Sequence, residues 1–496
     1  MKQYVMGIDQ GTTGTRAMIF RKDSSMAGSA YHEITQIYPQ PGWVEHDPLE
    51  IWDVTLRVIK QALQAAGLSA RDLAAIGIAN QRETTTFWHK YTGIPVGNSV
   101  VWQDRRSLPV VERMIAHDGV GIVDRTGMLL IPNISASKIR WAMEHQGPIK
   151  TGVEQGELVY GTLDTWLIWK LSGGKVHVSD YSNTSITTLL NARTLEYDQG
   201  VLEFLQIPRA ILPELKNSSE VYAYTDPDVF GAKVPIAGAA GDQQAAVLGQ
   251  ACIKAGMAKN TYGTGSFILY NTGSTYVPPI PGVFSPILWK LGETVSYGLE
   301  GMADVSGAAL QWLRDGLGII KAGDDAENLA KRVKDNGGVY FVPAFVGLGS
   351  PYFDSYARGT MVGITGDSQP GHIARAALEA MAYQVGDALA IMEKACGCKL
   401  NTLRVDGGGA KNDFLMQFQA NMLGIPVERP KITETTCLGA AYLAGLAVGV
   451  WGSLEEVAAH WQLERCFEPE FSQEQRDFLY GKWRKAVKQA SSWIEE

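Results

Sequence analysis

Short apolar runs and longer periodic segments alternate along the chain. Apolar residues recur at three- and four-residue steps over 373–394 and over 479–494, which is typical of amphipathic helices. Other apolar runs have the length of buried strands, and each adjoins a glycine-containing segment; they lie at 4–6, 74–78, 234–236, 266–270 and 402–405. This mixture of strands and helices predicts an α/β fold.

The N-terminal segment predicts two strands joined by a tight turn. The turn is Gly11-Thr12-Thr13-Gly14, and residues 15–20 after it alternate and are rich in β-branched and aromatic side chains. A Walker A loop or a Rossmann turn would open into a helix instead, and G-x-x-x-x-G-K-[ST] occurs nowhere in the sequence. The two commonest nucleotide-binding folds are therefore disfavoured.

The second half of the chain opens in a similar way. Glycine-rich segments at 238–241 and 263–265 adjoin apolar runs, and we interpret both segments as turns. Two halves that each place a glycine-rich turn beside a strand predict two lobes facing one central cleft. We place the boundary near residue 250, which gives lobes of 1–250 and 251–496.

Composition and charge narrow the class of function. The 496 residues contain 44 Lys and Arg against 52 Asp and Glu, a formal net charge of −8, whereas nucleic-acid binding requires a dense basic surface. No run of about 18 apolar residues occurs, so no membrane span is expected. Five cysteines are too few for a disulfide scaffold, which predicts a cytoplasmic protein. Their spacing does not match that of metal ligands, so no zinc site is expected.

Three glycine-containing segments carry groups suited to phosphates. Residues 9–13 combine a carboxylate that could hold hydrated Mg²⁺, a glycine that permits close approach and two hydroxyls, although a plain hairpin turn is the alternative. Residues 262–266 have the same chemistry around Thr264, and 406–412 place three glycines and Asn412 after a strand. Because a nucleoside triphosphate needs several such contacts, the three segments together predict a nucleotide site.

Two adjacent polar pairs also follow predicted strands. Arg82 and Glu83 offer fixed donors and an acceptor for vicinal hydroxyls, with a surface ion pair as the alternative. Asp242, with Gln243 beside it, could accept a hydroxyl proton, with a helix N-cap as the alternative. The histidines lie outside the glycine turns, which leaves a His-based triad without support.

Taken together, these motifs resemble the FGGY carbohydrate kinases. The resemblance runs over nearly the whole chain, from GIDQGTT at 7–13 to LGAAY at 438–442. Longer segments resemble the glycerol-phosphorylating members: YPQPGWVEHDP, NQRETT, VWQDRR, DTWLIWKL, AGDQQAA and NTYGTGSF. The resemblance implies two ribonuclease-H-like lobes of the actin/hexokinase type, with ATP, Mg²⁺ and a polyol in the cleft, and assembly into a homo-oligomer.

The resemblance also implies roles for individual residues. Asp242 corresponds to the catalytic base, and Asp9 and Asp242 are expected near Mg²⁺. The polyol is expected to contact Arg82, Glu83, Trp102, Asn133, Asp242, Gln243 and Phe267. ATP is expected to contact Thr12, Thr13, Gly14, Arg16, Thr264, Gly307, Gln311, Gly408 and Asn412.

One position departs from the family pattern. Alignment on Pro132 and Lys138 places Asn133 where a pocket tyrosine is expected, and asparagine is shorter but offers its amide to a hydroxyl. The expected reaction is phosphorylation of glycerol by ATP to sn-glycerol 3-phosphate. The alternatives are a kinase for a tetritol, dihydroxyacetone or a pentulose, and a non-catalytic nucleotide-dependent scaffold, which would bind ATP without polyol-stimulated turnover.

Overall fold

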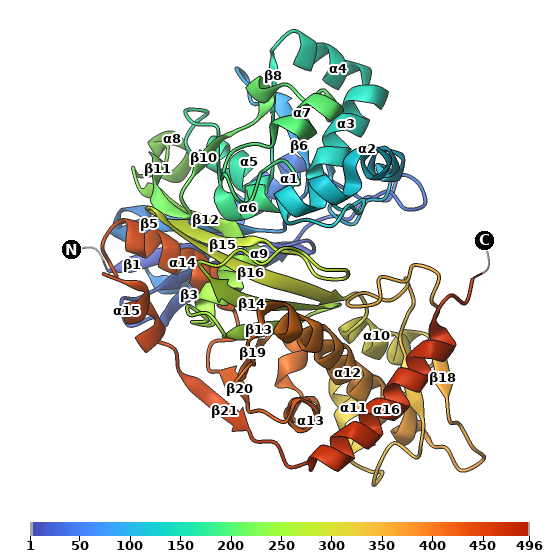
Figure 1. Ribbon diagram of the computed structural model, residues 1–496. Coiled ribbons are helices and arrows are strands. Elements are labelled where there is room, and N and C mark those ends of the chain that lie inside the picture. The colour runs from blue at the N-terminus through green and yellow to red at the C-terminus, as the bar shows by residue number, and fades with distance from the viewer. Residues whose placement is uncertain (1–2, 495–496) are drawn as a thin grey trace.

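Two mixed β-sheets form the framework of the computed structural model, which describes residues 3–494 (Figure 1). The first sheet has the order β11 (Ser219–Tyr224), β12 (Pro235–Gly241), β5 (Leu73–Asn80), β1 (Tyr4–Gln10), β2 (Gly14–Phe20) and β3 (Met26–Glu33). The second has the order β15 (Ile287–Leu291), β16 (Thr294–Ala303), β14 (Ser266–Gly273), β13 (Ala258–Tyr262), β19 (Leu403–Asp406), β20 (Val427–Pro430) and β21 (Leu463–Phe467).

The two sheets share one strand plan. In the first, β1 and β2 and then β2 and β3 pair antiparallel, while β5 is parallel to β1 and β12 is parallel to β5. In the second, β13, β14 and β16 form the antiparallel part, and β19 and β20 extend it in parallel from β13. The predicted α/β fold with two lobes of one topology is confirmed, as is the strand–turn–strand start.

Shorter strands and the helices complete the fold. The short strands pair as β4 (Glu45–His46) with β7 (Ser99–Val100), β6 (Thr86–His89) with β8 (Leu158–Gly161), β9 (Val178–Asp180) with β10 (Glu214–Lys216), and β17 (Tyr340–Val342) with β18 (Thr360–Val362). The helices are α1 (Pro48–Ala66), α2 (Leu108–Thr126), α3 (Ser135–His145), α4 (Gly147–Glu154), α5 (Leu163–Leu171), α6 (Tyr181–Ser185), α7 (Gln199–Leu205), α8 (Pro227–Phe230), α9 (Asp242–Gly249), α10 (Gly307–Asp315), α11 (Gly323–Ala330), α12 (Pro370–Cys396), α13 (Asp413–Leu423), α14 (Thr435–Ala447), α15 (Leu454–Ala459) and α16 (Gln473–Ala490).

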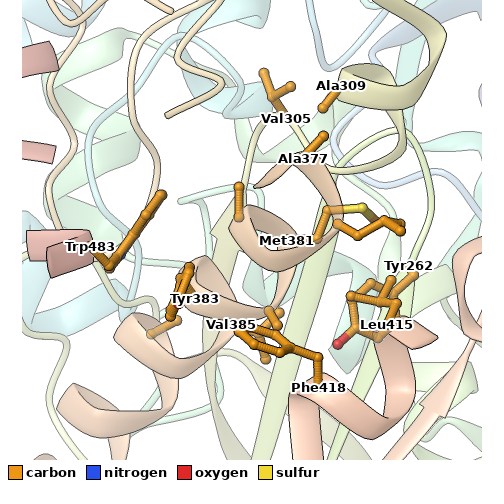
Figure 2. Packing of buried hydrophobic residues seen from close by; sticks show 14 of the residues in the cluster. Tyr262, Val305, Ala309, Ala377, Met381, Tyr383, Val385, Leu415, Phe418 and Trp483 are labelled. Atoms are coloured by element: carbon orange, nitrogen blue, oxygen red, sulfur yellow. The ribbon is translucent and has the colours of Figure 1, made fainter. Parts of the chain in front are cut away.

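The core of the second lobe forms around α12. Figure 2 shows Tyr383 of this helix facing Trp483 of α16, and their rings stack with centroids 5.1 Å apart. The helix predicted at 373–394 is therefore present as α12. The helix predicted at 479–494 begins six residues earlier and ends at Ala490, because the Ser472 side chain accepts a hydrogen bond from the Gln475 amide and fixes the start.

The glycines at 238–241 lie in β12, so their interpretation as a turn is wrong. The helix α14 packs against this strand, and a Cβ on Gly238 would come within 2.5 Å of the Ala444 nitrogen. Small residues here allow a helix to approach a sheet, and the chain does not reverse.

Figure 1 shows α14, from the second half of the chain, beside β1 and β5 of the first sheet. The boundary near residue 250 stays a prediction.

No helix within residues 3–494 combines the length and the apolar character needed to cross a membrane.

Candidate active site

A cavity of about 110 Å³ lies between the two halves of the chain. Its walls come from the turn after β1, the segment after β5, the start of α9, and the strands β14 and β16. Apolar side chains, among them Met128, Ile131 and Phe284, form part of the wall. The structure brings these sequence-predicted residues together around it: Thr12, Arg82, Glu83, Trp102, Asn133, Asp242, Gln243 and Phe267.

The guanidinium of Arg82 is held by carboxylates from both halves of the chain. Its Nη1 and Nη2 donate to the two carboxylate oxygens of Glu300 at 2.6 and 2.5 Å, and its Nε lies 3.2 Å from Asp242 Oδ1. The side chains of Arg82 and Glu300 are 11% and 5% exposed, so solvent screens this bidentate pair little. Glu300 was not predicted as a site residue from the sequence, although it is the one charged residue in β16.

The carboxyl of Asp242 opens α9, and Gly241 is the N-cap of that helix. Asp242 therefore does not take the N-cap role considered as its alternative. Its Oδ1 accepts a hydrogen bond from the Gln243 amide at 2.7 Å. Burial raises the pKa of Asp242 above its usual value, and the positive charge of Arg82 opposes that rise. A carboxylate with a raised pKa is a stronger proton acceptor when it is ionised.

A buried lysine orients the amide of Gln243. Lys259, on β13, donates to Gln243 Oε1 at 2.5 Å and to Thr261 Oγ1 at 2.8 Å. Because its oxygen is already engaged, Gln243 has its NH₂ group left to donate to a ligand in the cavity. Burial lowers the pKa of Lys259 to about 8. Lys259 was not predicted as a site residue from the sequence, and it lies sixteen positions from the residue that it orients.

The backbone of Glu83 has a left-handed conformation, with φ of 64°. Such angles are uncommon outside glycine and concentrate at functional sites. The Ser135 hydroxyl donates to the Glu83 carbonyl at 2.9 Å and so braces the conformation. Burial raises the pKa of the Glu83 carboxyl, and the Lys138 charge opposes the rise. Within residues 3–494 this carboxylate accepts no hydrogen bond, so it is free to accept from a ligand.

Trp102 connects the apolar wall to the first glycine turn. Its indole Nε1 donates to Thr12 Oγ1 at 2.9 Å, and its ring meets that of Phe267 nearly edge-on with centroids 6.4 Å apart. Asn133 is buried at the same cavity, and the ammonium of Lys138 donates to its backbone carbonyl. The backbone at Asn133 is therefore fixed, while its side-chain amide has no hydrogen-bond partner among the described residues.

The carboxylate of Asp9, on β1, fits a bound cation. Its Oδ1 is buried and has no hydrogen-bond partner, and burial together with the negative charge of Asp242 raises the pKa of Asp9 to about 7. A cation would relieve both penalties, and hydrated Mg²⁺ typically uses one or two carboxylates and keeps several waters. In the described part of the chain, no group of three or more His, Cys, Asp or Glu side chains is arranged to hold a metal.

The turn that carries Thr264 packs against the start of α10. The Gly307 amide donates to the Gly263 carbonyl at 3.0 Å, and the Ser306 amide donates to the Thr264 carbonyl at 2.9 Å. A Cβ on Gly307 would lie 2.6 Å from the Gly263 oxygen, so the contact requires glycine. The predicted nucleotide residues Thr264 and Gly307 are therefore neighbours, and Gln311 is exposed one helical turn further along α10.

The glycine run after β19 lies near the same place. Gly407 has φ of 82°, and a Cβ on it would approach the Tyr262 carbonyl to 2.5 Å, which places this turn against the end of β13. Gly408 is exposed in this turn, and Asn412 caps α13 by accepting from the Leu415 amide at 2.8 Å. These turns thus meet where β13 and β19 end.

The predicted nucleotide residues of the first lobe lie around the turn between β1 and β2. Thr13 is exposed and Gly14 begins β2. Arg16 forms an ion pair with Glu434 and stacks over Tyr31.

Comparison with known proteins follows the same two-part division. The family model for the N-terminal domain of the FGGY family of carbohydrate kinases matches residues 4–249, and that for the C-terminal domain matches 258–448. Glycerol kinase 2 of Thermotoga maritima is 52% identical over 99% of each chain, and the glycerol kinase of Caldanaerobacter subterraneus is 52% identical over 100% of each. The crystal structure of Plasmodium falciparum glycerol kinase with ADP is 32% identical, covers 99% of both chains and has a TM-score of 0.92.

Proposed function

The chain belongs to the FGGY family of carbohydrate kinases, and we propose that it transfers the terminal phosphoryl group of ATP to glycerol, giving sn-glycerol 3-phosphate and ADP. The observation that carries this proposal is the 110 Å³ cavity, where hydroxyl-binding groups surround Asp242. Full-length relatives at 52% identity that are glycerol kinases, and a similar structure that holds ADP, support it.

The polyol is oriented by the groups that line the cavity. The Glu83 carboxylate accepts from hydroxyls, the Gln243 NH₂ group donates to them, and Arg82 donates while Glu300 fixes its plane. Trp102 and Phe267 cover the carbon chain. These contacts align one terminal hydroxyl with the phosphoryl group, which is the main contribution that phosphoryl transfer requires.

Asp242 is the proton acceptor in this reaction. Its carboxylate accepts the proton of the aligned hydroxyl as the oxygen bonds to the phosphorus atom of ATP, and ADP leaves with the bridging oxygen. The Thr12 and Thr264 turns face the phosphates, and Gly307, Gly408 and Asn412 face the nucleoside. Asp9 and Asp242 would hold Mg²⁺, which when bound neutralises charge on the phosphate oxygens.

We also propose that the protein is cytoplasmic and forms a homo-oligomer. The five cysteines are all unpaired, as in a reducing compartment. The oligomeric state rests on the family resemblance.

An assay of ADP release with glycerol and with no polyol tests the proposal. We expect glycerol to stimulate ADP release at least a hundredfold over the basal hydrolysis of ATP. ATP binding without any polyol-stimulated release would contradict a kinase and would favour the scaffold alternative.

The pair between Arg82 and Glu300 gives a further expected result. Glu300→Gln keeps the shape of the side chain but removes the charge that holds Arg82. The guanidinium then pairs more fully with Asp242 and lowers the pKa of that base. We expect kcat to fall about ten- to a hundredfold, the range that one charged hydrogen bond supports.

The control for Glu300→Gln is Asp315→Asn, which removes an exposed carboxylate paired with its neighbour Arg314. Its kcat should match that of the parent chain. A Glu300→Gln variant with normal kcat and a normal melting temperature would remove Glu300 from the positioning role.

The pH dependence of glycerol use should reflect Glu83 together with Asp242, whose pKa is raised by burial as well. Because burial raises its pKa, Glu83 takes up a proton at a higher pH than an ordinary carboxyl, and kcat/KM should fall on the acid side at a pH well above 4. Stability should change in the opposite sense. The folded state binds this proton more tightly than the unfolded chain, so the free energy of unfolding decreases as pH rises above the unfolded pKa.

The variant Glu83→Gln carries a fixed neutral side chain at this position. We expect lower kcat/KM for glycerol, a shifted acid limb, and a higher melting temperature than the parent at pH 8. An acid limb that stays at the same pH in this variant would assign it to another group.

A further inference from the structure

A second cavity, of about 300 Å³, adjoins the polyol cavity. The two cavities share the side chains of Trp102, Ile131, Asn133 and Met302, so they meet at these four residues. Both halves of the chain contribute to the second cavity, as they do to the first. Glycerol in the smaller cavity would leave the larger one to solvent.

Polar groups with unused hydrogen-bonding capacity line the second cavity. Asp304 follows β16, and its carboxylate accepts no hydrogen bond from any residue in 3–494. Burial raises the pKa of Asp304 to about 6, and the charge of Arg105 opposes the rise, so the group is mostly ionised at pH 7. The side chains of Gln103 and Arg105 also have no hydrogen-bond partner in the described part of the chain. Gln103 and Arg105 are exposed, and apolar side chains such as Val346 and Phe353 complete the lining. The cavity therefore offers one half-buried acceptor and exposed donors beside an apolar wall.

Asn133 lies where the two cavities meet. The hydrogen bond from Lys138 to its backbone carbonyl fixes the chain there, and its side-chain amide can donate to one hydroxyl and accept from another. The family resemblance implies a tyrosine at this position, and that larger side chain would take up space that asparagine leaves open. None of the residues expected to contact ATP lines the second cavity. Thr12 lines the first cavity, so a ligand that filled both cavities would leave the expected nucleotide contacts other than Thr12 free.

We propose that the second cavity is a subsite for the distal carbons and hydroxyls of a linear polyol of four or five carbons. Asp304 accepts from its hydroxyls, and Arg105 and the Asn133 amide donate to them. The inference rests on the proposed kinase function and widens its substrate class. A neutral polyhydroxy chain offers hydroxyls to the carboxylate and the donors together. An apolar tail would leave the half-buried Asp304 carboxylate unpaired, and that carboxylate would repel a phosphate.

The experiment compares kcat/KM for glycerol, erythritol, D-threitol and xylitol in the ADP-release assay. We expect at least one of the longer polyols to reach a kcat/KM within tenfold of that for glycerol. Asp304→Leu, which keeps the branched shape of the side chain but removes the acceptor, should lower that value at least tenfold and change the value for glycerol less than threefold.

Two further variants keep the test independent of folding. Asp304→Asn retains one acceptor oxygen and should give an intermediate loss with the longer polyol. Asp315→Asn, an exposed carboxylate far along α10, should leave every substrate unchanged. Melting temperatures with and without the longer polyol show whether each variant is folded and still binds.

The outcomes separate the subsite from the reaction. Glycerol turnover that exceeds that of every longer polyol by more than tenfold overturns the subsite and leaves the glycerol kinase proposal standing. Equal losses for glycerol and for the longer polyol in Asp304→Leu also overturn it. Turnover of a longer polyol without turnover of glycerol supports the subsite and contradicts glycerol as the substrate. If no polyol is phosphorylated, both the subsite and the glycerol kinase proposal are overturned.

Discussion

Asp242→Asn is expected to lower kcat by about 10²- to 10⁴-fold, the usual contribution of a general base. Asparagine keeps the size of the side chain and can still accept the hydrogen bond from the Gln243 amide, so the start of α9 is preserved. It cannot take the proton of the attacking hydroxyl. Because Arg82, Glu83 and Gln243 remain, KM for glycerol should stay within a few-fold of the parent value.

The measurement is a steady-state comparison of kcat and KM, with thermal melting of both proteins. Burial disfavours the charge of Asp242, so the neutral variant should melt at the same or a higher temperature at pH 7.5. Asp315→Asn is again the matched carboxylate control. Retention of kcat within tenfold would take the role of base away from Asp242.

Residues that line the 110 Å³ cavity could be predicted from the sequence because several of them lie next to strand ends. Arg82 and Glu83 follow β5, and Asp242 follows β12, where the parallel strands of the first sheet end at one edge. The glycine turn between β1 and β2 lies at that edge as well. Local motifs of this kind stay recognisable in the sequence, and one sheet edge brings them together.

Glu300 and Lys259 were not predicted because they lie within strands of the second half of the chain and not in the segments that follow strand ends. Neither lies in a glycine turn, and each acts through a residue far away in sequence: Glu300 through Arg82 and Lys259 through Gln243. Their position in buried strands was the available signal, since fully buried charges are rare unless they are paired. The partner of such a charge depends on tertiary structure.

The packing of α14 against the first sheet also could not be predicted from the sequence. The residues of this helix lie between β20 and β21 of the second sheet in the chain, yet it packs across β1, β5 and β12 of the first. The glycines of these strands meet successive turns of the helix: Gly7 meets Cys437, Gly77 meets Ala440 and Gly238 meets Ala444. The helix positions are spaced by three and four residues and so share one face. From the sequence alone, a glycine within an apolar run predicts a turn or a bulge. Only the tertiary structure shows that it makes room for a helix.

Gly77→Ala is expected to destabilise the protein severely. A Cβ at this position would lie 1.8 Å from the backbone oxygen of Ala440, and a backbone atom cannot move aside as a flexible side chain can. Either α14 or β5 must shift. Overpacking of this kind costs about 1–3 kcal/mol and at times more, and we expect the upper end because helix and sheet backbones are both constrained.

Gly481→Ala is the matched control for this prediction. It adds the same methyl group in the middle of α16, where a Cβ would meet nothing within 4 Å. Since alanine favours helix, its melting temperature should equal or exceed that of the parent. For Gly77→Ala we expect a large fall in melting temperature and a loss of glycerol turnover, because Arg82 and Glu83 follow directly after the end of β5. A Gly77→Ala protein that melts with the parent would show that α14 does not approach the sheet as closely as the glycines allow.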